Sequence, residues 1–408
     1  MKTLLICVHR EELLHQTMKT FSKIGVLAQG VTSKTKVIDF TKRVIVIMSQ
    51  TLESRLKKNP NFVNVPDEII VDESHHSHYL KIAEHFPEAR LIGVTATPIS
   101  KKGFRMDEIF DRLVIGRNIK SLIQDNAIVQ DICYHLPMKP EDFSKLKKSN
   151  TEGGFTTKSM NSVFNQGLLI DTVFEYYKKH SEGKKTMIFC CSIAHAIETT
   201  KHFVERGVNA RCFSSKSDDN RKEIVDWIKT TPDAVLISLD IFTAGFDVDD
   251  IETIILFRST TSLSLFLQIV GRGCRSTEAI FKDSFKVIDF GNNFVRFGLW
   301  SSDRDWTKLF NFTPPESSGT APVKECSECG RVNFASATVC DECEHPFPVK
   351  KPEALIEPEM KKVVSVGGWS LPEVNVHSFF NFCKRQKFKE AKSVYLLIEA
   401  SIRVLKVY

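Results

Sequence analysis

The sequence predicts a mixed α/β protein with two parallel-sheet domains in tandem, followed by a small cysteine module. Three observations lead to this fold class. Short apolar runs of strand length alternate with segments of helical periodicity. These runs show no polar alternation, which is typical of strands that are buried on both faces in a parallel sheet. The pattern occurs twice along the chain, and four cysteines in two close pairs come after it.

The first predicted domain covers residues 1–115. Its apolar runs are separated by material such as Glu11–Ile24, whose apolar residues recur at helical spacing. Strands that alternate with helices form βαβ units, so we expect the carboxyl ends of these strands at one edge of a sheet. The expected strands are Leu4–Val8, Val44–Met48, Ile69–Asp72 and Leu91–Thr95.

The second predicted domain covers residues 116–312. The pattern fades at about residues 116–160 and then resumes, with a helix expected at Ala194–Arg206. A segment rich in Pro, Ser and Gly ends the domain and begins residues 313–350, a linker with the cysteine module. Residues 351–408 form a further small module. The expected strands of the second domain are Thr186–Cys190, Ala210–Phe213, Ala234–Leu239, Thr253–Phe257 and Phe285–Phe290.

Composition excludes several classes of protein. Of the 408 residues, 42% are hydrophobic and 26% are charged, which matches a globular chain and excludes wholesale disorder. No run of 18 apolar residues is present, and the apolar start at Leu4–Val8 is too short for a signal peptide. We therefore expect a cytoplasmic protein without a membrane partner. The net charge of +6 permits a polyanionic partner, and an odd count of 11 cysteines argues against a disulfide scaffold.

Polar residues follow two of the predicted strands. Asp72 and Glu73 come directly after Ile-Ile-Val, at the strand end where ligands collect in parallel α/β sheets. A carboxylate pair at this position is suited to hold a hydrated Mg²⁺ and to orient a water, although a surface turn is the alternative. The next strand ends in Thr95–Pro98, which by itself is a β-branched strand end closed by proline.

A pair of arginines lies late in the second domain. The segment Gln268–Arg275 reads Gln-x-x-Gly-Arg-x-x-Arg, which places Arg272 and Arg275 three residues apart. On a helix this spacing puts both guanidinium groups on one face. Two such planar groups suit the oxygens of a triphosphate, and the alternative is an exposed basic turn of helix.

These segments, in this order, resemble the motifs of superfamily 2 helicases. Asp72–His75 reads Asp-Glu-x-His and resembles motif II, Thr95–Pro98 resembles motif III, and Gln268–Arg275 resembles motif VI. The resemblance covers about residues 1–300. Further matches are Leu5–Thr17 to motif Ia, Val46–Leu52 to motif Ib, Ile188–Ser192 to the position of motif IV, and Thr243–Asp247 to motif V.

The resemblance implies two RecA-like domains, the first of them incomplete, with ATP and Mg²⁺ in the cleft between them. It also implies roles for individual residues. Thr95 and Thr97 would link the nucleotide state to domain closure, and Gly245 and Asp247 would bind nucleotide. The residues implied for catalysis are Asp72, Glu73, His75, Gln268, Arg272 and Arg275, and those implied for the nucleic-acid backbone are Arg10, Gln50, Ser192 and Thr243.

The cysteine module contains Cys326-x₂-Cys329 and Cys340-x₂-Cys343, separated by ten residues. Four thiolates at this spacing are typical of a zinc ribbon that binds one Zn²⁺, and a redox pair is the alternative. A zinc ribbon behind an Asp-Glu-x-His core resembles the RadD-like group of bacterial and phage DNA-repair helicases. That group implies a sequence-independent partner, single-stranded or branched DNA, and a role in repair or recombination in a bacterium or a phage.

One expected motif is not in the sequence. The Gly-x-x-x-x-Gly-Lys-Ser/Thr loop that cradles phosphates in such helicases lies upstream of motif Ia, and this sequence begins at motif Ia. Gly183–Thr186 precedes a predicted strand and is a loop of another kind. Two alternatives to an intact ATP-dependent helicase therefore stay open: a non-catalytic nucleic-acid-binding remnant, or a subunit that receives the phosphate loop from another protein. RNA as the substrate and the motor of a restriction enzyme are further alternatives.

Overall fold

The computed structural model describes most of residues 3–347. The described ranges are 3–75, 80–100, 104–136, 138, 140–149, 154–213, 221–239, 248, 250–276, 282–311, 323–334 and 337–347, and every structural statement below concerns these residues. The expected module at 351–408 lies outside them, as does the expected motif V segment Thr243–Asp247. No helix in the described ranges is long and apolar enough to cross a membrane.

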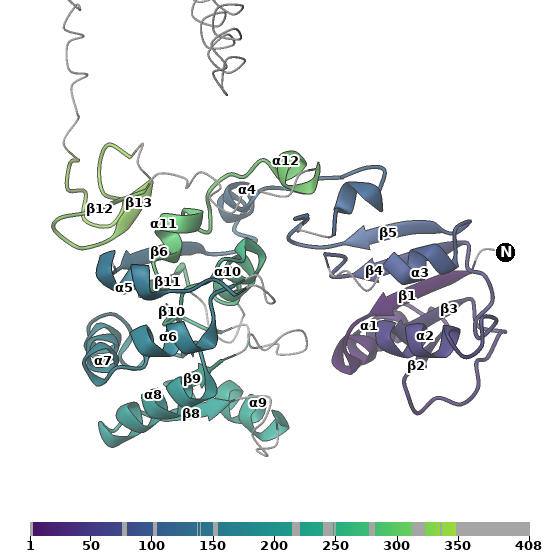
Figure 1. Ribbon diagram of the computed structural model, residues 1–408, viewed down its shortest axis with the longest axis horizontal. Coiled ribbons are helices and arrows are strands. Elements are labelled where there is room, and N and C mark those ends of the chain that lie inside the picture. The colour runs from purple at the N-terminus through teal and green to yellow at the C-terminus, as the bar shows by residue number, and fades with distance from the viewer. Residues whose placement is uncertain are drawn as a thin grey trace, which may run out of the picture. The chain divides into compact units, whose positions relative to one another are not determined.

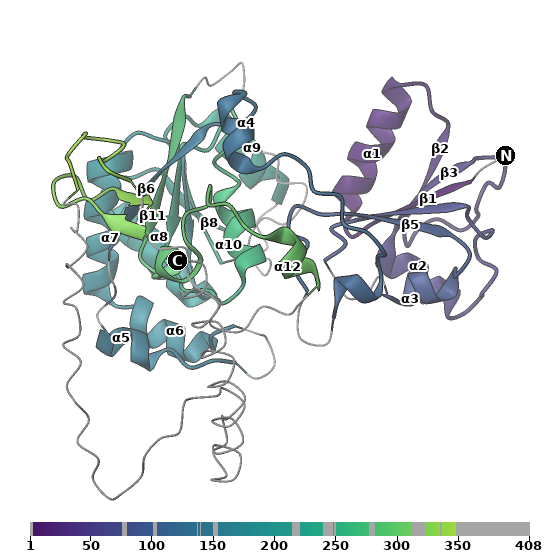
Figure 2. The same ribbon diagram turned by 90° about the horizontal axis from the view of Figure 1, so that it is seen from above.

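The first sheet has five described strands, all parallel, in the order β2-β3-β1-β4-β5. Strand β1 is at the centre because its apolar residues pair with β3 on one side and β4 on the other. Helix α1 (Glu11–Lys23) covers one face, and α2 (Ser49–Leu56) and α3 (Leu80–His85) cover the other, as Figures 1 and 2 show. The strands are β1 (Leu4–Val8), β2 (Ala28–Val31), β3 (Val44–Met48), β4 (Glu68–Asp72) and β5 (Arg90–Val94).

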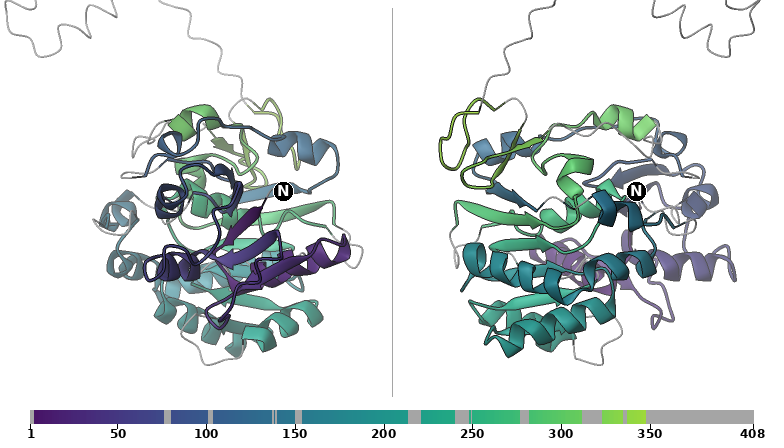
Figure 3. Two further views of the ribbon diagram at one scale, coloured as in Figure 1. Left: turned by 90° about the vertical axis from the view of Figure 1, so that its right-hand side faces the viewer. Right: turned by 60° about the vertical axis from the view of Figure 1, so that its left-hand side comes forward.

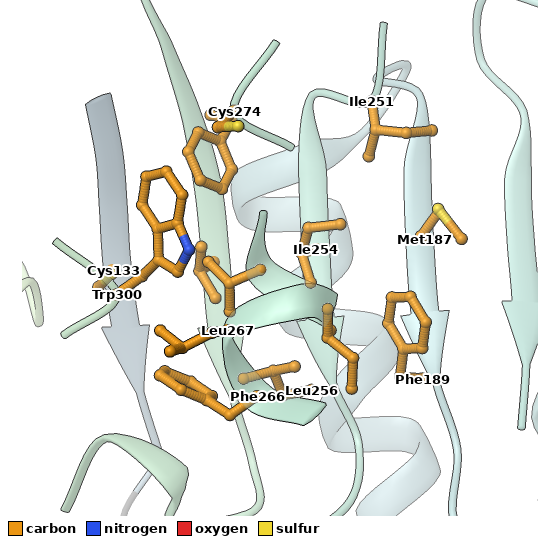
Figure 4. Close-up of a cluster of buried hydrophobic side chains, with 14 of the residues drawn as sticks. Cys133, Met187, Phe189, Ile251, Ile254, Leu256, Phe266, Leu267, Cys274 and Trp300 are labelled. Atoms are coloured by element: carbon orange, nitrogen blue, oxygen red, sulfur yellow. The ribbon is translucent and has the colours of Figure 1, made fainter. Parts of the chain in front are cut away.

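The second sheet has six described strands, again all parallel, in the order β6-β11-β10-β7-β9-β8. Apolar side chains alternate between its two faces, so two separate cores form. Helices α6 (Thr157–Phe164), α7 (Gly167–Ser181) and α8 (Ile193–Glu205) cover one face (Figure 3). Helices α9 (Arg221–Thr230) and α10 (Leu263–Val270) cover the other, and Figure 4 shows Phe266 and Leu267 of α10 packed in that core. The strands are β6 (Gln130–His135), β7 (Thr186–Phe189), β8 (Ala210–Phe213), β9 (Val235–Ser238), β10 (Thr253–Leu256) and β11 (Ser284–Asp289).

The predicted α/β fold with two parallel-sheet domains is confirmed. Every strand expected from an apolar run is present, with ends that differ by no more than two residues. Two strands were missed. Strand β2 reads Ala-Gln-Gly-Val and β6 reads Gln-Asp-Ile-Cys-Tyr-His, so neither gives a continuous apolar run. Both lie at sheet edges and pair with one neighbour each, which makes polar residues acceptable there.

Short helices connect the two sheets and continue beyond the second. They are η2 (Met106–Glu108), α4 (Ile119–Gln124), α5 (Pro140–Lys145), α11 (Asn293–Phe297) and α12 (Trp306–Asn311). Helix α12 follows the second sheet but contacts the segment after β5. The Ser100 N–H donates to the Leu309 carbonyl at 3.0 Å, and the Arg105 guanidinium donates to the Asn311 carbonyl at 2.9 Å. Phe104 and Met106 share a small core with Phe310. Within the described residues the chain therefore passes between the two domains at residues 111–118 and again at residues 298–305.

The cysteine module packs on the second sheet. Its hairpin consists of β12 (Val323–Glu325) and β13 (Val332–Phe334), which pair antiparallel. Arg331 forms a β-bridge with Tyr134 of β6, and Val332 is buried in the core of the second domain. The module thus covers the free edge of β6.

A buried carboxylate organises the turn after β11. Asp289 is completely buried and accepts hydrogen bonds from the N–H groups of Gly291 at 2.9 Å and Phe294 at 2.8 Å. The Asn293 amide donates both to Asp289 and to the Arg258 carbonyl, each at 2.8 Å. Burial raises the pKa of Asp289, and these donors and His135 oppose that shift. The turn lies so close to the end of β10 that a Cβ atom on Gly291 would be 1.8 Å from the Arg258 carbonyl oxygen.

We therefore expect Gly291→Ala to lower the free energy of unfolding by about 3 kcal/mol, because the clash is with backbone and cannot be relieved by a side-chain rotation. Urea denaturation followed by circular dichroism measures it. The control is Gly167→Ala in α7, where a Cβ atom meets nothing within 4 Å, and stability should stay the same or rise by up to about 1 kcal/mol. Equal stability of both variants would contradict the close approach at Gly291.

Candidate functional site

A cavity of about 740 Å³ brings together residues from both domains. It lies at the carboxyl ends of β4 and β5, where the edge of a parallel sheet commonly binds ligands. From the second domain, the end of α10 and the turn after it contribute to the lining. The sequence-predicted residues that line the cavity are Glu73, Thr95, Thr97, Gln268, Arg272 and Arg275.

The carboxylate pair lies where β4 ends. Asp72 is the last residue of the strand, and its carboxylate accepts a hydrogen bond from the Glu73 N–H at 2.9 Å. Glu73 has a φ of 51°, a left-handed backbone that non-glycine residues adopt mainly where function or a tight turn requires it. Burial raises the pKa of the Asp72 carboxyl, and the charge of Glu73 raises it further. A divalent cation would offset this repulsion, so the pair fits the oxygen ligands that Mg²⁺ prefers.

A chain of polar contacts leads from this pair to the end of β5. The His75 ring is 3% exposed, and its Nδ1 lies 3.2 Å from Glu73 Oε2 and 3.0 Å from Thr95 Oγ1. Thr95 Oγ1 also accepts a hydrogen bond from the Thr97 N–H at 3.1 Å. The residues expected in motifs II and III therefore form one connected group.

The expectation that Arg272 and Arg275 share a helix face is wrong. Helix α10 ends at Val270, and the two arginines lie in the turn that follows it. Gly273 allows this turn, because a Cβ atom there would lie 2.2 Å from the Phe285 ring. Both arginines nevertheless line the cavity, so the turn brings them to the place that the helix was expected to provide.

The residues expected on the nucleic-acid backbone fall into three groups. Arg10 and Gln50 follow the neighbouring strands β1 and β3, whose last residues, Val8 and Met48, are paired, so both lie at the same sheet edge. Ser192 is buried, its hydroxyl caps α8 by accepting from the His195 N–H at 3.1 Å, and it contacts Asn161; its contact with nucleic acid stays a prediction. Thr243 lies outside the described residues, as do Gly245 and Asp247.

Several lining residues were not found from the sequence. Trp300 and Trp306 follow the second sheet, and Arg112 and Arg117 lie between the two sheets. None of them belongs to a motif or shows a periodic pattern. They reach the cavity only because the chain passes between the domains at both places, which is a property of the tertiary structure.

The four cysteines of the module meet at one point. Their sulfur atoms lie within 4.8 Å of one another, with Cys326 and Cys343 at 3.6 Å and Cys329 and Cys340 at 3.6 Å. Sulfurs bound tetrahedrally to zinc at ~2.3 Å lie roughly 3.8 Å apart, so the four residues fit a zinc ion. The Asn333 amide donates to Cys340 Sγ at 3.6 Å, as an outer-shell partner of a metal ligand would.

The remaining described cysteines are of a different kind. Cys7, Cys190, Cys191 and Cys274 are buried, as expected of small hydrophobic residues. Burial raises the pKa of Cys7 to about 12, which keeps its thiol protonated.

Comparison with known proteins supports the two-domain arrangement. The family described as "Type III restriction enzyme, res subunit" matches residues 1–100, and the "Helicase conserved C-terminal domain" matches residues 168–277. A 51.5 kDa protein of a Lactococcus phage is 28% identical over 85% of this chain and 73% of its own length. The putative ATP-dependent helicase IRC3 of Saccharomyces cerevisiae is 30% identical over 70% of this chain and 43% of its own length.

A subunit of the type I restriction enzyme EcoAI of Escherichia coli is 23% identical over 80% of this chain and 45% of its own length. The chain thus spans less than half the length of the yeast and E. coli relatives. The two matched families fall on the two parallel sheets whose strand ends and turns form the cavity. Their order, together with these relatives, makes the chain similar to helicases and restriction-enzyme subunits of the superfamily 2 type, over both of the domains that carry the cavity.

Proposed function

We propose that this protein is part of an ATP-dependent helicase or translocase that acts on DNA. One observation carries the proposal: the cavity joins the acidic end of β4 in the first domain to two arginines of the second domain. Acidic groups for a metal ion and arginines for phosphate, on separate domains, are suited to a nucleotide whose hydrolysis alters the domain arrangement.

The roles follow from the chemistry of each group. Asp72 and Glu73 would hold Mg²⁺, which neutralises phosphate charge when bound, and Glu73 with His75 would orient the attacking water. Arg272 and Arg275 would stabilise charge on the γ-phosphate, and Gln268 would contact it beside them. For Gly245 and Asp247, nucleotide binding stays a prediction from the sequence alone, as does the backbone contact of Thr243.

The phosphate loop would come from a polypeptide segment that is not among these 408 residues. Support comes from β5, which ends the described strand order of the first sheet and leaves Ile92 at 39% and Val94 at 53% exposed. Parallel sheets are normally covered by helices on both faces, so the face that carries Ile92 and Val94 would be covered by the helix of a further strand–loop–helix unit. The loop after a further parallel strand beside β5 would lie at the cavity, because parallel strands end at the same side of a sheet and Thr95, directly after β5, lines the cavity.

We propose DNA, single-stranded or branched, as the partner, bound without sequence preference along the edge that carries Arg10 and Gln50. A repair or recombination role of the RadD type stays a prediction from the resemblance, and a phage source agrees with the Lactococcus phage relative. RNA is the alternative substrate, and a restriction motor is favoured by the type I restriction enzyme relative. A non-catalytic nucleic-acid-binding subunit is the alternative from another class. The cytoplasmic location stays a prediction.

We also propose that the boundaries expected from the sequence hold: domains at 1–115 and 116–312, linker and ribbon at 313–350, and a further module at 351–408. The ribbon would bind one Zn²⁺ through its four cysteines, which supplies the folding energy that so small a hairpin lacks.

The first prediction concerns ATP. Residues 1–408 alone should hydrolyse ATP no faster than buffer, because their sequence contains no Gly-x-x-x-x-Gly-Lys-Ser/Thr loop to cradle the β-phosphate. Addition of a strand–phosphate-loop–helix segment should restore DNA-stimulated turnover, measured by phosphate release. In the restored protein Asp72→Ala should abolish turnover, and the exposed control Glu88→Ala should not. If residues 1–408 alone hydrolysed ATP rapidly and Asp72→Ala abolished that activity, the phosphate loop would not be required.

The second prediction concerns DNA. Arg10→Ala should weaken binding to single-stranded DNA and lower the slope of log affinity against log salt by about 0.7, one phosphate contact. Fluorescence anisotropy at several salt concentrations measures both. The control is Arg43→Ala, which removes the same charge just before β3, at the opposite edge of the same sheet. If the two variants behave alike, a generally basic surface explains the binding.

The third prediction concerns the metal. The purified chain should contain one zinc per molecule by elemental analysis after dialysis. Cys340→Ser with Cys343→Ser should remove it, and the control Cys212→Ser, outside the cluster, should not. A metal ratio near zero in the unaltered protein would exclude the zinc ribbon.

A further inference from the structure

A buried pair of hydroxyl groups joins the two domains. Thr97 Oγ1, just after β5, lies 2.7 Å from Ser264 Oγ in α10, and the two residues are 1% and 5% exposed. They are 167 positions apart in the sequence. A buried hydroxyl without a partner costs free energy, so each of these groups depends on the other domain for its hydrogen bond.

The pair ends the chain of polar contacts that begins at the carboxylates. Glu73 contacts His75, His75 contacts Thr95, and Thr95 accepts from the Thr97 N–H. The Thr97 hydroxyl then reaches Ser264. A connected path of polar contacts, an ion pair followed by three hydrogen bonds, therefore extends from the acidic end of β4 into a helix of the second domain.

Helix α10 is held as one unit, so Ser264 and the cavity-lining end of the helix move together. The Ser262 hydroxyl caps the helix by accepting from the Leu265 N–H at 3.2 Å, and Phe266 and Leu267 fasten it to the sheet (Figure 4). Ser264 and Gln268 are four residues apart, so they lie on one face of the helix, one turn from each other. The turn with Arg272 follows directly after the helix. A shift of Ser264 relative to Thr97 would therefore move the cavity-lining end of the helix as well.

We propose that Ser264 is a positioning residue, which sets α10 against the end of β5 so that Gln268 and Arg272 face Glu73 across the cavity. The meaning of this arrangement for phosphate chemistry rests on the proposed function. The hydrogen bond between Thr97 and Ser264 does not rest on the proposed function, because its effect can be measured without nucleotide.

The test uses the whole chain and amide hydrogen exchange. Thr and Val have nearly the same shape, so Ser264→Thr and Ser264→Val differ in the hydroxyl but not in volume. Ser264→Val should raise exchange about fivefold both in α10 and in residues 95–99 of the other domain, since a net hydrogen bond contributes about 1 kcal/mol. Ser264→Thr should keep the exchange of the unaltered protein.

The reciprocal variant completes a double-mutant cycle. Thr97→Val should raise exchange in α10, and the double variant should exchange no faster than either single one. The control is Ser159→Ala, which removes a buried hydroxyl whose hydrogen bonds, to Lys147 and Thr156, stay within the second domain. It should raise exchange near residues 147–160 and leave residues 95–99 unchanged.

Equal exchange in Ser264→Thr and Ser264→Val, or additive effects in the double variant, would overturn the proposal. Since the hydrogen-exchange measurement needs no ATP, its result stays valid if the ATPase prediction fails. Conversely, if Ser264→Val raised amide exchange in α10 but not in residues 95–99, the role of Ser264 would be rejected. The proposed ATPase activity would not be affected by that result.

Discussion

The whole arrangement depends on one constraint: every described strand of both large sheets is parallel to its neighbours. Because parallel strands end at the same edge, the residues that follow them gather without any pairing between distant loops. The carboxylates after β4 and the threonines after β5 become neighbours in this way, and so do Arg10 and Gln50 after β1 and β3. The grouping of the candidate site residues is thus a consequence of strand direction. The helices mainly cover both faces of each sheet and exclude water from them.

Within that edge, local backbone and burial decide what each group does. Glu73 turns back through a left-handed conformation, which brings its carboxylate towards the imidazole of His75 rather than to solvent. The neighbouring Asp72 is partly buried beside a like charge, and both burial and that charge raise its pKa. The carboxylates of Asp72 and Glu73 therefore repel each other, and this repulsion favours binding of a divalent cation.

Much of the fold could be predicted from the sequence, because buried parallel strands leave continuous apolar runs such as Val44–Met48. Edge strands need no such run: β2 and β6 lack one and were missed, whereas β5 and β8, also at sheet edges, were predicted. Motif spacing predicted Arg272 and Arg275 as cavity residues, although the helix assumed to carry them ends at Val270. Ser264 and Trp306 could not be predicted, since their significance arises from which domain they touch. Ser192 shows the converse: a motif position was named, and a capping hydrogen bond uses its hydroxyl.

The second passage of the chain between the domains limits how far they can separate. Arg304 is fastened to the second domain by hydrogen bonds to four carbonyl groups, those of Phe297, Leu299, Trp300 and Ser302. Only Asp305 stands between it and α12, which is held by Ser100 and Arg105 of the first domain. Two extended residue steps span about 7 Å. The other described connection, residues 111–118, is longer, so movement of the two domains would be a rotation centred near Arg304 and Asp305 rather than a separation.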